Sequence, residues 1–128
     1  QVISDFRRII FNGDHLTFAD FNREHERCLS FLKDAVSCSK ARRKIVVTHH
    51  VPSFQMQCPK FADSQANGAF TVELEEYIKN SGIDYWIFGH SHYNVDVKIG
   101  NTNCMSNQLG YVFHGEHESF NPGKYIEV

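Results

Sequence analysis

Two similar stretches of sequence decide the fold: IVVTHHVP at residues 45–52 and YWIFGHSH at residues 85–92. Each begins with an uninterrupted apolar run, which is β-branched in residues 45–47 and rich in aromatic residues in 85–88. Such runs are typical of strands that are buried on both faces, as in a parallel sheet. Each run leads directly into histidines. The sequence therefore predicts two buried strands with imidazoles at their carboxyl ends.

An amphipathic helix is expected before each of these strands. The first helix begins near Asp20, a favoured N-cap residue, and ends in the polar stretch 37–43. The second ends at Gly82, a residue type that commonly terminates helices. The apolar residues that recur at helical spacing are Phe21, Cys28, Leu32 and Ala35 in the first helix and Phe70, Leu74, Tyr77 and Ile78 in the second. Because helix and buried strand alternate twice, we expect an α/β fold whose mixed sheet is parallel in part.

The remaining segments predict a long loop and several short strands. Residues 53–69 show little apolar periodicity and are expected to form a loop, and loops of this length in compact domains are often functional. Short strands are expected at residues 2–3, 8–11, 95–99, 103–106, 111–113 and 125–128. The length of 128 residues and the lack of internal repeats predict a single domain.

Composition restricts the possible function classes. With 41% hydrophobic and 13% aromatic residues, the chain has enough apolar material for a packed core. Thirteen Lys and Arg side chains against fifteen Asp and Glu give a formal net charge of -2, which argues against a nucleic-acid partner. No apolar run is long enough to span a bilayer, and the four cysteines show no Cys-x-x-Cys spacing. We therefore expect a cytoplasmic protein without membrane contact.

Histidine placement is the main functional signal. Histidines follow both predicted buried strands, at His49, His50, His90 and His92. The carboxyl ends of parallel strands lie at one edge of a sheet, where ligands of open α/β sheets bind. A His-x-His pair places both side chains on one side if the backbone stays extended, and Gly89 allows a sharp turn just before it. Since imidazole is a common ligand of Zn, Mn and Fe, these positions predict a metal site.

The two strand-histidine stretches resemble the last two signature blocks of the calcineurin-like metallophosphoesterases. Residues 46–52 contain THHVP, which is similar to that family's THHxP string, and residues 87–92 end in GHSH, which is similar to its GHxH string. Residues 106–111 and 120–128 look like the family's closing strands. The resemblance implies that residues 1–128 are the C-terminal portion of such a domain, and that they form part of a β-sandwich with a mixed sheet, flanked by helices.

The resemblance also implies roles for the histidines. His49 would be a metal ligand, His90 would share the same metal, and His92 would bind a second ion. His50 would be a catalytic neighbour of the substrate, or would itself be the ligand in place of His49. The implied cofactors are two divalent metal ions (Mn, Zn or Fe), which activate water and stabilise the attacking and leaving oxygens of a phosphate ester.

The other signature blocks of that family do not occur in this sequence. The first half of the family's domain supplies Asp-x-His, Gly-Asp-x-x-Asp and Gly-Asn-His strings, which hold the bridging carboxylate and the remaining ligands. The string Gly13-Asp14-His15 does not match, because Thr17 stands where an Asp is required and no Asn-His follows. Residues 1–128 would therefore hold about half of a two-metal ligand set. We expect a missing N-terminal half or a second chain to complete it.

These observations favour a metal-dependent phosphoesterase, a hydrolase that cleaves phosphate mono- or diesters with metal-activated water. One alternative is a non-catalytic metal-binding or interaction module derived from a phosphoesterase. Another is an α/β binding domain in which the histidines are incidental. His114 and His117 stand in the string FHGEHE, residues 113–118, which we interpret as a solvated turn between edge strands and not as a chelating cluster.

Overall fold

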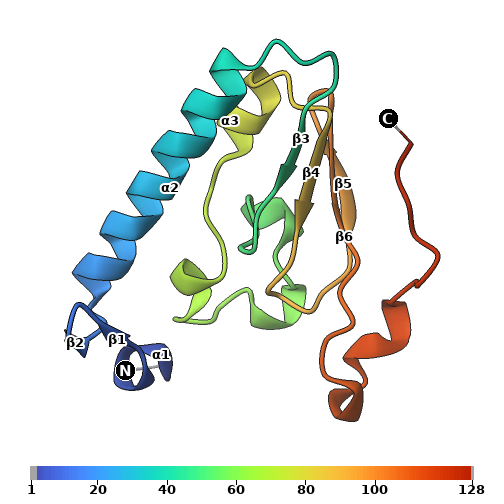
Figure 1. The fold of residues 1–128 in the computed structure, drawn as a ribbon. Helices are drawn as coiled ribbons and strands as arrows, with labels where there is room; N and C mark the ends of the chain where they lie inside the picture. The colour runs from blue at the N-terminus through green and yellow to red at the C-terminus, as the bar shows by residue number, and fades with distance from the viewer. Residues whose placement is uncertain (1–2, 128) are drawn as a thin grey trace. The chain divides into compact units, whose positions relative to one another are not determined.

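The computed structural model describes residues 3–127 and contains two compact units, one of residues up to Lys40 and one of residues from Ala41 onward (Figure 1). The strand expected at residues 2–3 begins outside the described residues. Of the helices formed by residues 3–127, none combines the length and the apolar character needed to cross a membrane.

The first unit consists of a short helix, a hairpin and a long helix. Its elements are α1 (Asp5–Arg8), β1 (Ile10–Phe11), β2 (Asp14–His15) and α2 (Phe18–Cys38). The strands β1 and β2 pair antiparallel through a turn at Asn12 and Gly13, which both have a positive φ, as Asn-Gly hairpin turns require. The buried ring of Phe6 packs on Phe18 and Phe21, whose centroids lie 4.1 and 6.0 Å away.

The helix α2 is capped by Thr17 and not by Asp20. The Thr17 hydroxyl accepts a hydrogen bond from the Asp20 N–H at 3.1 Å, and the Asp20 carboxylate accepts one from the Thr17 N–H at 3.2 Å. This reciprocal capping box satisfies two N–H groups at the start of the helix. Asp20 is therefore the third helical residue, and the predicted N-cap was placed too far along the chain.

The second unit is built on a four-stranded mixed sheet, which confirms the predicted α/β class. Its strands are β3 (Ile45–Val47), β4 (Tyr85–Phe88), β5 (Asp96–Ile99) and β6 (Thr102–Ser106), in the order β3-β4-β6-β5. The pairs β3–β4 and β4–β6 are parallel, whereas β5 and β6 are antiparallel. Figure 1 shows β3 and β4 side by side with arrowheads pointing the same way. The carboxyl ends of β3, β4 and β6 therefore lie at one edge of the sheet.

The core of this unit surrounds the middle of β4. Trp86 is fully buried, its ring centroid lies 6.4 Å from that of Tyr77, and its Nε1 donates a hydrogen bond to the Thr48 hydroxyl at 2.9 Å. Other buried core side chains are Val51, Met56, Ile78, Ile83 and Cys104. Burial raises the pKa of the Cys104 thiol to about 11, so this thiol stays protonated at neutral pH and is a poor nucleophile.

The strand β3 is not buried on both faces, contrary to the expectation from its apolar run. Val46 is buried, but Ile45 is 43% exposed and Val47 is 70% exposed. Ile45 and Val47 project from the face opposite to Val46, and β3 has a neighbouring strand on one side only, so these two side chains are little covered. The interior strand β4 buries Trp86 and Phe88 on one face, whereas Tyr85 and Ile87 on the other face are only partly buried. An apolar run thus identified both strands, but it did not distinguish an edge strand from a central one.

The segment between β3 and β4 contains the predicted loop and a shorter helix than predicted. Three short 3-10 turns interrupt the loop: η1 (Phe54–Met56), η2 (Pro59–Phe61) and η3 (Asn67–Ala69). The helix α3 spans only Glu75–Asn80, because the chain before it pairs with residues 51 and 52. There Val51 and Thr71 form a parallel bridge, and the Leu74 N–H donates to the Pro52 carbonyl at 3.0 Å.

The C-terminal segment, which is the part of the chain that follows β6, does not form the strands expected at 111–113 and 125–128. The first of these regions forms the 3-10 turn η4 (Val112–His114), followed by η5 (Glu116–Ser119), and residues 125–127 are not in a strand. Residue 128 lies outside the described residues. Gly110 and Gly115 have φ values of 63° and 74°, so the extended run that the apolar residues favour is broken on both sides.

Candidate histidine site

Backbone hydrogen bonds continue the pairing of β3 and β4 past the ends of the strands. The Thr48 N–H donates to the Ile87 carbonyl at 2.9 Å, and the Gly89 N–H donates to the His49 carbonyl at 3.1 Å. The Thr48 hydroxyl donates to the His50 carbonyl at 3.0 Å. The positions of both histidines after β3 are therefore set by strand pairing and by the hydroxyl that follows the strand.

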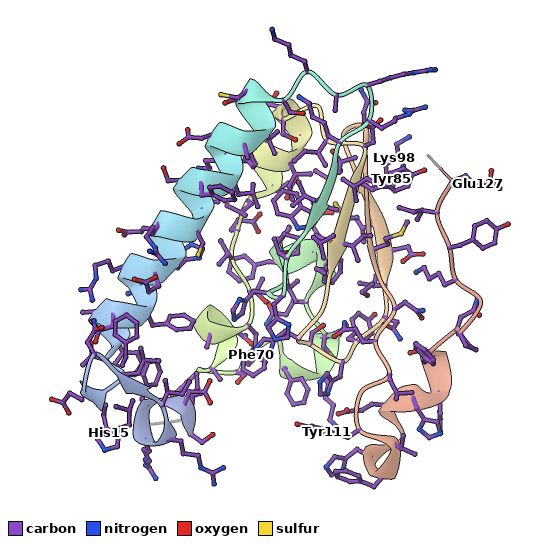
Figure 2. The ribbon with its side chains drawn as sticks, in the orientation of Figure 1. His15, Phe70, Tyr85, Lys98, Tyr111 and Glu127 are labelled. Atoms are coloured by element: carbon purple, nitrogen blue, oxygen red, sulfur yellow. The ribbon has the colours of Figure 1, made fainter. Side chains whose placement is uncertain are left out.

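Three imidazoles meet where these strands end. The ring centroids are 4.6 Å apart for His49 and His90, 4.8 Å for His50 and His90, and 5.4 Å for His49 and His50. Phe70 stacks on His90, with centroids 4.4 Å apart and ring planes inclined by 25°. Figure 2 shows Phe70 beyond the arrowheads of β3 and β4. The structure thus brings together three of the four histidines that the sequence singles out, and adds an aromatic ring from the long loop.

The fourth histidine, His92, contacts a different set of residues. His90 and His92 have φ values of 69° and 50°, in the left-handed region that only a few per cent of non-glycine residues adopt. The backbone is therefore not extended through the His-x-His string. The His92 Nδ1 lies 2.8 Å from Glu116 Oε2, and the ring centroid of His92 lies 4.7 Å from that of Tyr111.

Gly89 does not provide this turn, contrary to the expectation. Its φ is not among the positive values of the chain, and a Cβ placed on it would lie 3.6 Å from the His49 carbonyl oxygen, which is an ordinary contact. The reversal is made instead by the left-handed residues His90 and His92. The glycine before the His-x-His string was thus misleading, because the positive φ values belong to His90 and His92 and not to Gly89.

Gln108, which is not predicted from the sequence, braces the histidine turn. It follows β6, so it lies at the same edge of the sheet as the histidines. Its Oε1 accepts a hydrogen bond from the His92 N–H at 2.9 Å, and its Nε2 donates to the Ser91 hydroxyl at 3.2 Å and to the Tyr93 carbonyl at 3.1 Å. The sequence predicted a short strand at 103–106 just before it, but not that this strand pairs parallel with β4.

Glu116 links His92 to the C-terminal segment. Its Oε2 accepts a hydrogen bond from the Tyr111 N–H at 2.6 Å and also lies 2.8 Å from His92 Nδ1. The Tyr111 N–H and, to a smaller extent, His92 hold the pKa of the Glu116 carboxyl below its usual range. The string 113–118, interpreted above as a solvated turn, does form short 3-10 turns, but it also supplies this partner of His92.

Gly110→Ala is expected to destabilise the C-terminal segment by about 2–3 kcal/mol, because a residue at positive φ and an overpacked contact each cost on the order of 1 kcal/mol or more. A Cβ on Gly110, whose φ is 63°, would lie 2.6 Å from Glu116 Cβ and 3.2 Å from His92 Cβ. Hydrogen exchange should accelerate at the Tyr111 N–H and stay unchanged at Trp86 in β4. The matched control is Gly68→Ala, where nothing lies within 4 Å of an added Cβ. Unchanged exchange at Tyr111 would contradict the crowding argument.

The histidine cluster is not a complete metal site. Within residues 3–127, no group of three or more His, Cys, Asp or Glu side chains is arranged so that it could hold a metal ion. The imidazoles of His49, His50 and His90 are donors of a suitable chemical type for a transition metal. The described residues alone nevertheless do not fit such an ion.

Comparison with known proteins gives one family and one distant relative. The sequence model of the family described as "Calcineurin-like phosphoesterase" matches residues 3–94, which include all four histidines of the site region but neither Gln108 nor Glu116. The chain is 29% identical over 120 residues to "Uncharacterized protein L509" of Acanthamoeba polyphaga mimivirus. That alignment covers 88% of this chain and 41% of the viral protein, so the chain spans about two fifths of its relative's length. No solved structure matches the chain.

Proposed function

The chain belongs to the calcineurin-like phosphoesterase family, and from this premise we propose that it is part of a hydrolase that cleaves phosphate esters. The observation that carries the proposal is the meeting of His49 and His90, which follow two neighbouring parallel strands and have ring centroids 4.6 Å apart. Ligands of open α/β sheets bind at the carboxyl ends of the strands, and the imidazoles there are suited to metal and phosphate chemistry.

The proposed roles follow the order of the histidines along the chain. His49 and His90 would hold one divalent metal ion, His92 would contribute to a second, and His50 would lie beside the ester. The ions are Mn, Zn or Fe, and when bound they supply an activated water and neutralise charge on the phosphate. Because the described residues do not fit a metal ion on their own, the remaining ligands come from outside residues 1–128.

A further part of the protein, or a second chain, is proposed to cover β3. The edge strand exposes Ile45 and Val47, although its sequence is apolar throughout. Apolar strand edges of this kind are normally paired or covered in native proteins. The added part would supply the missing ligands and extend the mixed sheet toward the sandwich that the family resemblance implies. The viral relative is long enough to contain such a part, since the match covers only 41% of it.

Phosphatase assays of two versions of the protein test this proposal. We expect a version extended at its N-terminus to hydrolyse a model diester or monoester, such as a p-nitrophenyl phosphate, in the presence of Mn or Zn. A chelator should abolish the turnover. Residues 1–128 alone should show little turnover, because their ligand set is incomplete. Robust, chelator-sensitive turnover by residues 1–128 would contradict the half-site argument.

A second candidate function is a non-catalytic metal-binding or interaction module. It is supported by the same finding, that residues 3–127 contain no complete set of metal ligands. This candidate predicts a folded protein that shows no hydrolysis in either version. Metal content after purification separates the catalytic case from a pure interaction module, since only the former should retain close to two ions per chain. A non-catalytic metal-binding module would retain metal and still show no hydrolysis.

A further inference from the structure

We propose that Glu116 is a positioning residue that fixes the orientation and the tautomer of His92. The inference rests on the proposed function, which assigns His92 the role of a metal ligand. It goes beyond the family match, which ends at residue 94. Glu116 belongs to the C-terminal segment, and Figure 2 shows Tyr111 of that segment beside its short turns.

The carboxylate of Glu116 is itself held in place, so that it can act as a fixed acceptor. Its Oε2 lies 2.8 Å from His92 Nδ1 and accepts the Tyr111 N–H at 2.6 Å. The two side chains are about one third exposed, 33% for His92 and 31% for Glu116. An acceptor that is anchored by a backbone N–H defines a single direction for the imidazole N–H that reaches it.

The other contacts of His92 agree with this direction. The ring packs edge-on against Tyr111, with an interplanar angle of 84°. The backbone N–H of His92 is held by Gln108 Oε1 at 2.9 Å, which supports the left-handed conformation of the residue. Gly110 lets the C-terminal segment approach, since a Cβ there would collide with Glu116 and crowd His92. The stretch from Gln108 to Glu116 thus holds both the backbone and the imidazole of His92.

The chemical consequence concerns the second ring nitrogen. If Nδ1 carries the proton that is donated to the Glu116 carboxylate, the lone pair of the neutral ring is on Nε2. A carboxylate that holds one nitrogen in this way orients the ring and makes the other nitrogen a better ligand. Glu116 would therefore present Nε2 of His92 to whatever the completed site holds.

Nitrogen NMR of His92 in the full chain tests the positioning role without relying on activity. At about pH 8.5, where free imidazole is neutral, we expect the wild-type ring to be protonated at Nδ1. Glu116→Ala should shift the proton toward Nε2, whereas Glu116→Gln should retain the wild-type tautomer, because its amide oxygen can still accept. Glu118→Ala is the matched control, since it removes an exposed carboxylate two residues away. Unchanged nitrogen shifts for His92 in Glu116→Ala would overturn the proposal.

Activity in the N-terminally extended protein provides the second readout. Glu116→Ala should lower kcat/KM about 10- to 100-fold, the usual effect of removing an outer partner of a ligand, and Glu116→Gln should restore part of it. Equal losses in Glu116→Ala and Glu118→Ala would overturn the positioning role. Failure of the proposed function has a different signature. In that case the extended protein would show no hydrolysis, or its activity would be unchanged in His49→Ala and His90→Ala, while the tautomer of His92 would still depend on Glu116.

Discussion

Trp86→Ala is expected to lower the free energy of unfolding of the chain by about 3–5 kcal/mol, the usual cost of truncating a buried aromatic side chain to alanine. Trp86 is fully buried in the interior strand β4 and packs edge-on against Tyr77. The replacement would leave a cavity in the middle of the sheet and remove the hydrogen bond to Thr48, the residue that also holds the His50 carbonyl. Since small domains have a total stability of roughly 5–15 kcal/mol, the variant should be close to unfolding.

Denaturant titration followed by circular dichroism would measure this loss. Fluorescence is unsuitable, because Trp86 is the sole tryptophan of the chain. Trp86→Phe is the matched variant, since it keeps a six-membered aromatic ring and removes the five-membered ring with its indole N–H. We expect it to cost about 1–2 kcal/mol, as for one lost hydrogen bond and a smaller ring. A cost below 1 kcal/mol for Trp86→Ala would show that β4 is not central to the core.

His90→Ala and His49→Ala are each expected to lower kcat/KM of the N-terminally extended protein by about 10²–10³-fold, the range found when one group that stabilises developing charge is removed. Both imidazoles belong to the cluster at the strand ends, and His90 contacts both of its neighbours there. Because His90 also stacks on Phe70, its replacement should loosen the long loop, so the fold of each variant must be checked by circular dichroism.

Two further variants complete this experiment. His15→Ala is the matched control, because His15 is exposed and belongs to the first unit. It should leave kcat/KM unchanged. His50→Ala decides which histidine after β3 is the ligand. A larger loss for His50→Ala than for His49→Ala would exchange the roles proposed above. Wild-type activity in both His49→Ala and His90→Ala would remove the basis for a phosphoesterase site here.

The strands and the meeting of three histidines were predictable because short-range patterns determine them. The apolar runs that contain Val46 and Trp86 are long enough to identify strands, and each is followed at once by histidine. Parallel pairing then brings His49 and His90 to the same edge without further information. The Thr17 cap could also have been predicted from the sequence, because Thr and Asp spaced three residues apart form a recognisable capping box.

The partners of His92 could not be predicted because they depend on contacts between distant parts of the chain. Glu116 reaches His92 only because the chain folds back at Gly110 and Gly115, where the apolar string between the glycines had suggested a strand. Gln108 reaches the histidine turn because β6, the strand before it, lies next to β4 in the sheet. Local sequence patterns do not predict this strand order. The exposure of Val47 has the same origin, since sequence periodicity does not report which strand is at the edge.

The placement of β6 between β4 and β5 constrains the order in which the sheet can assemble. β5 and β6 are joined by a tight turn at Gly100 and Asn101, so their antiparallel contacts are local and should form within microseconds. Parallel pairing of β6 with β4, and above all of β4 with β3, requires much longer loops to close. Closing a longer loop costs the chain more conformational entropy. We therefore expect the hairpin to be the nucleus onto which β4 docks. The strand that precedes His49 would join last, so the histidine cluster would be among the final features to form as the chain folds.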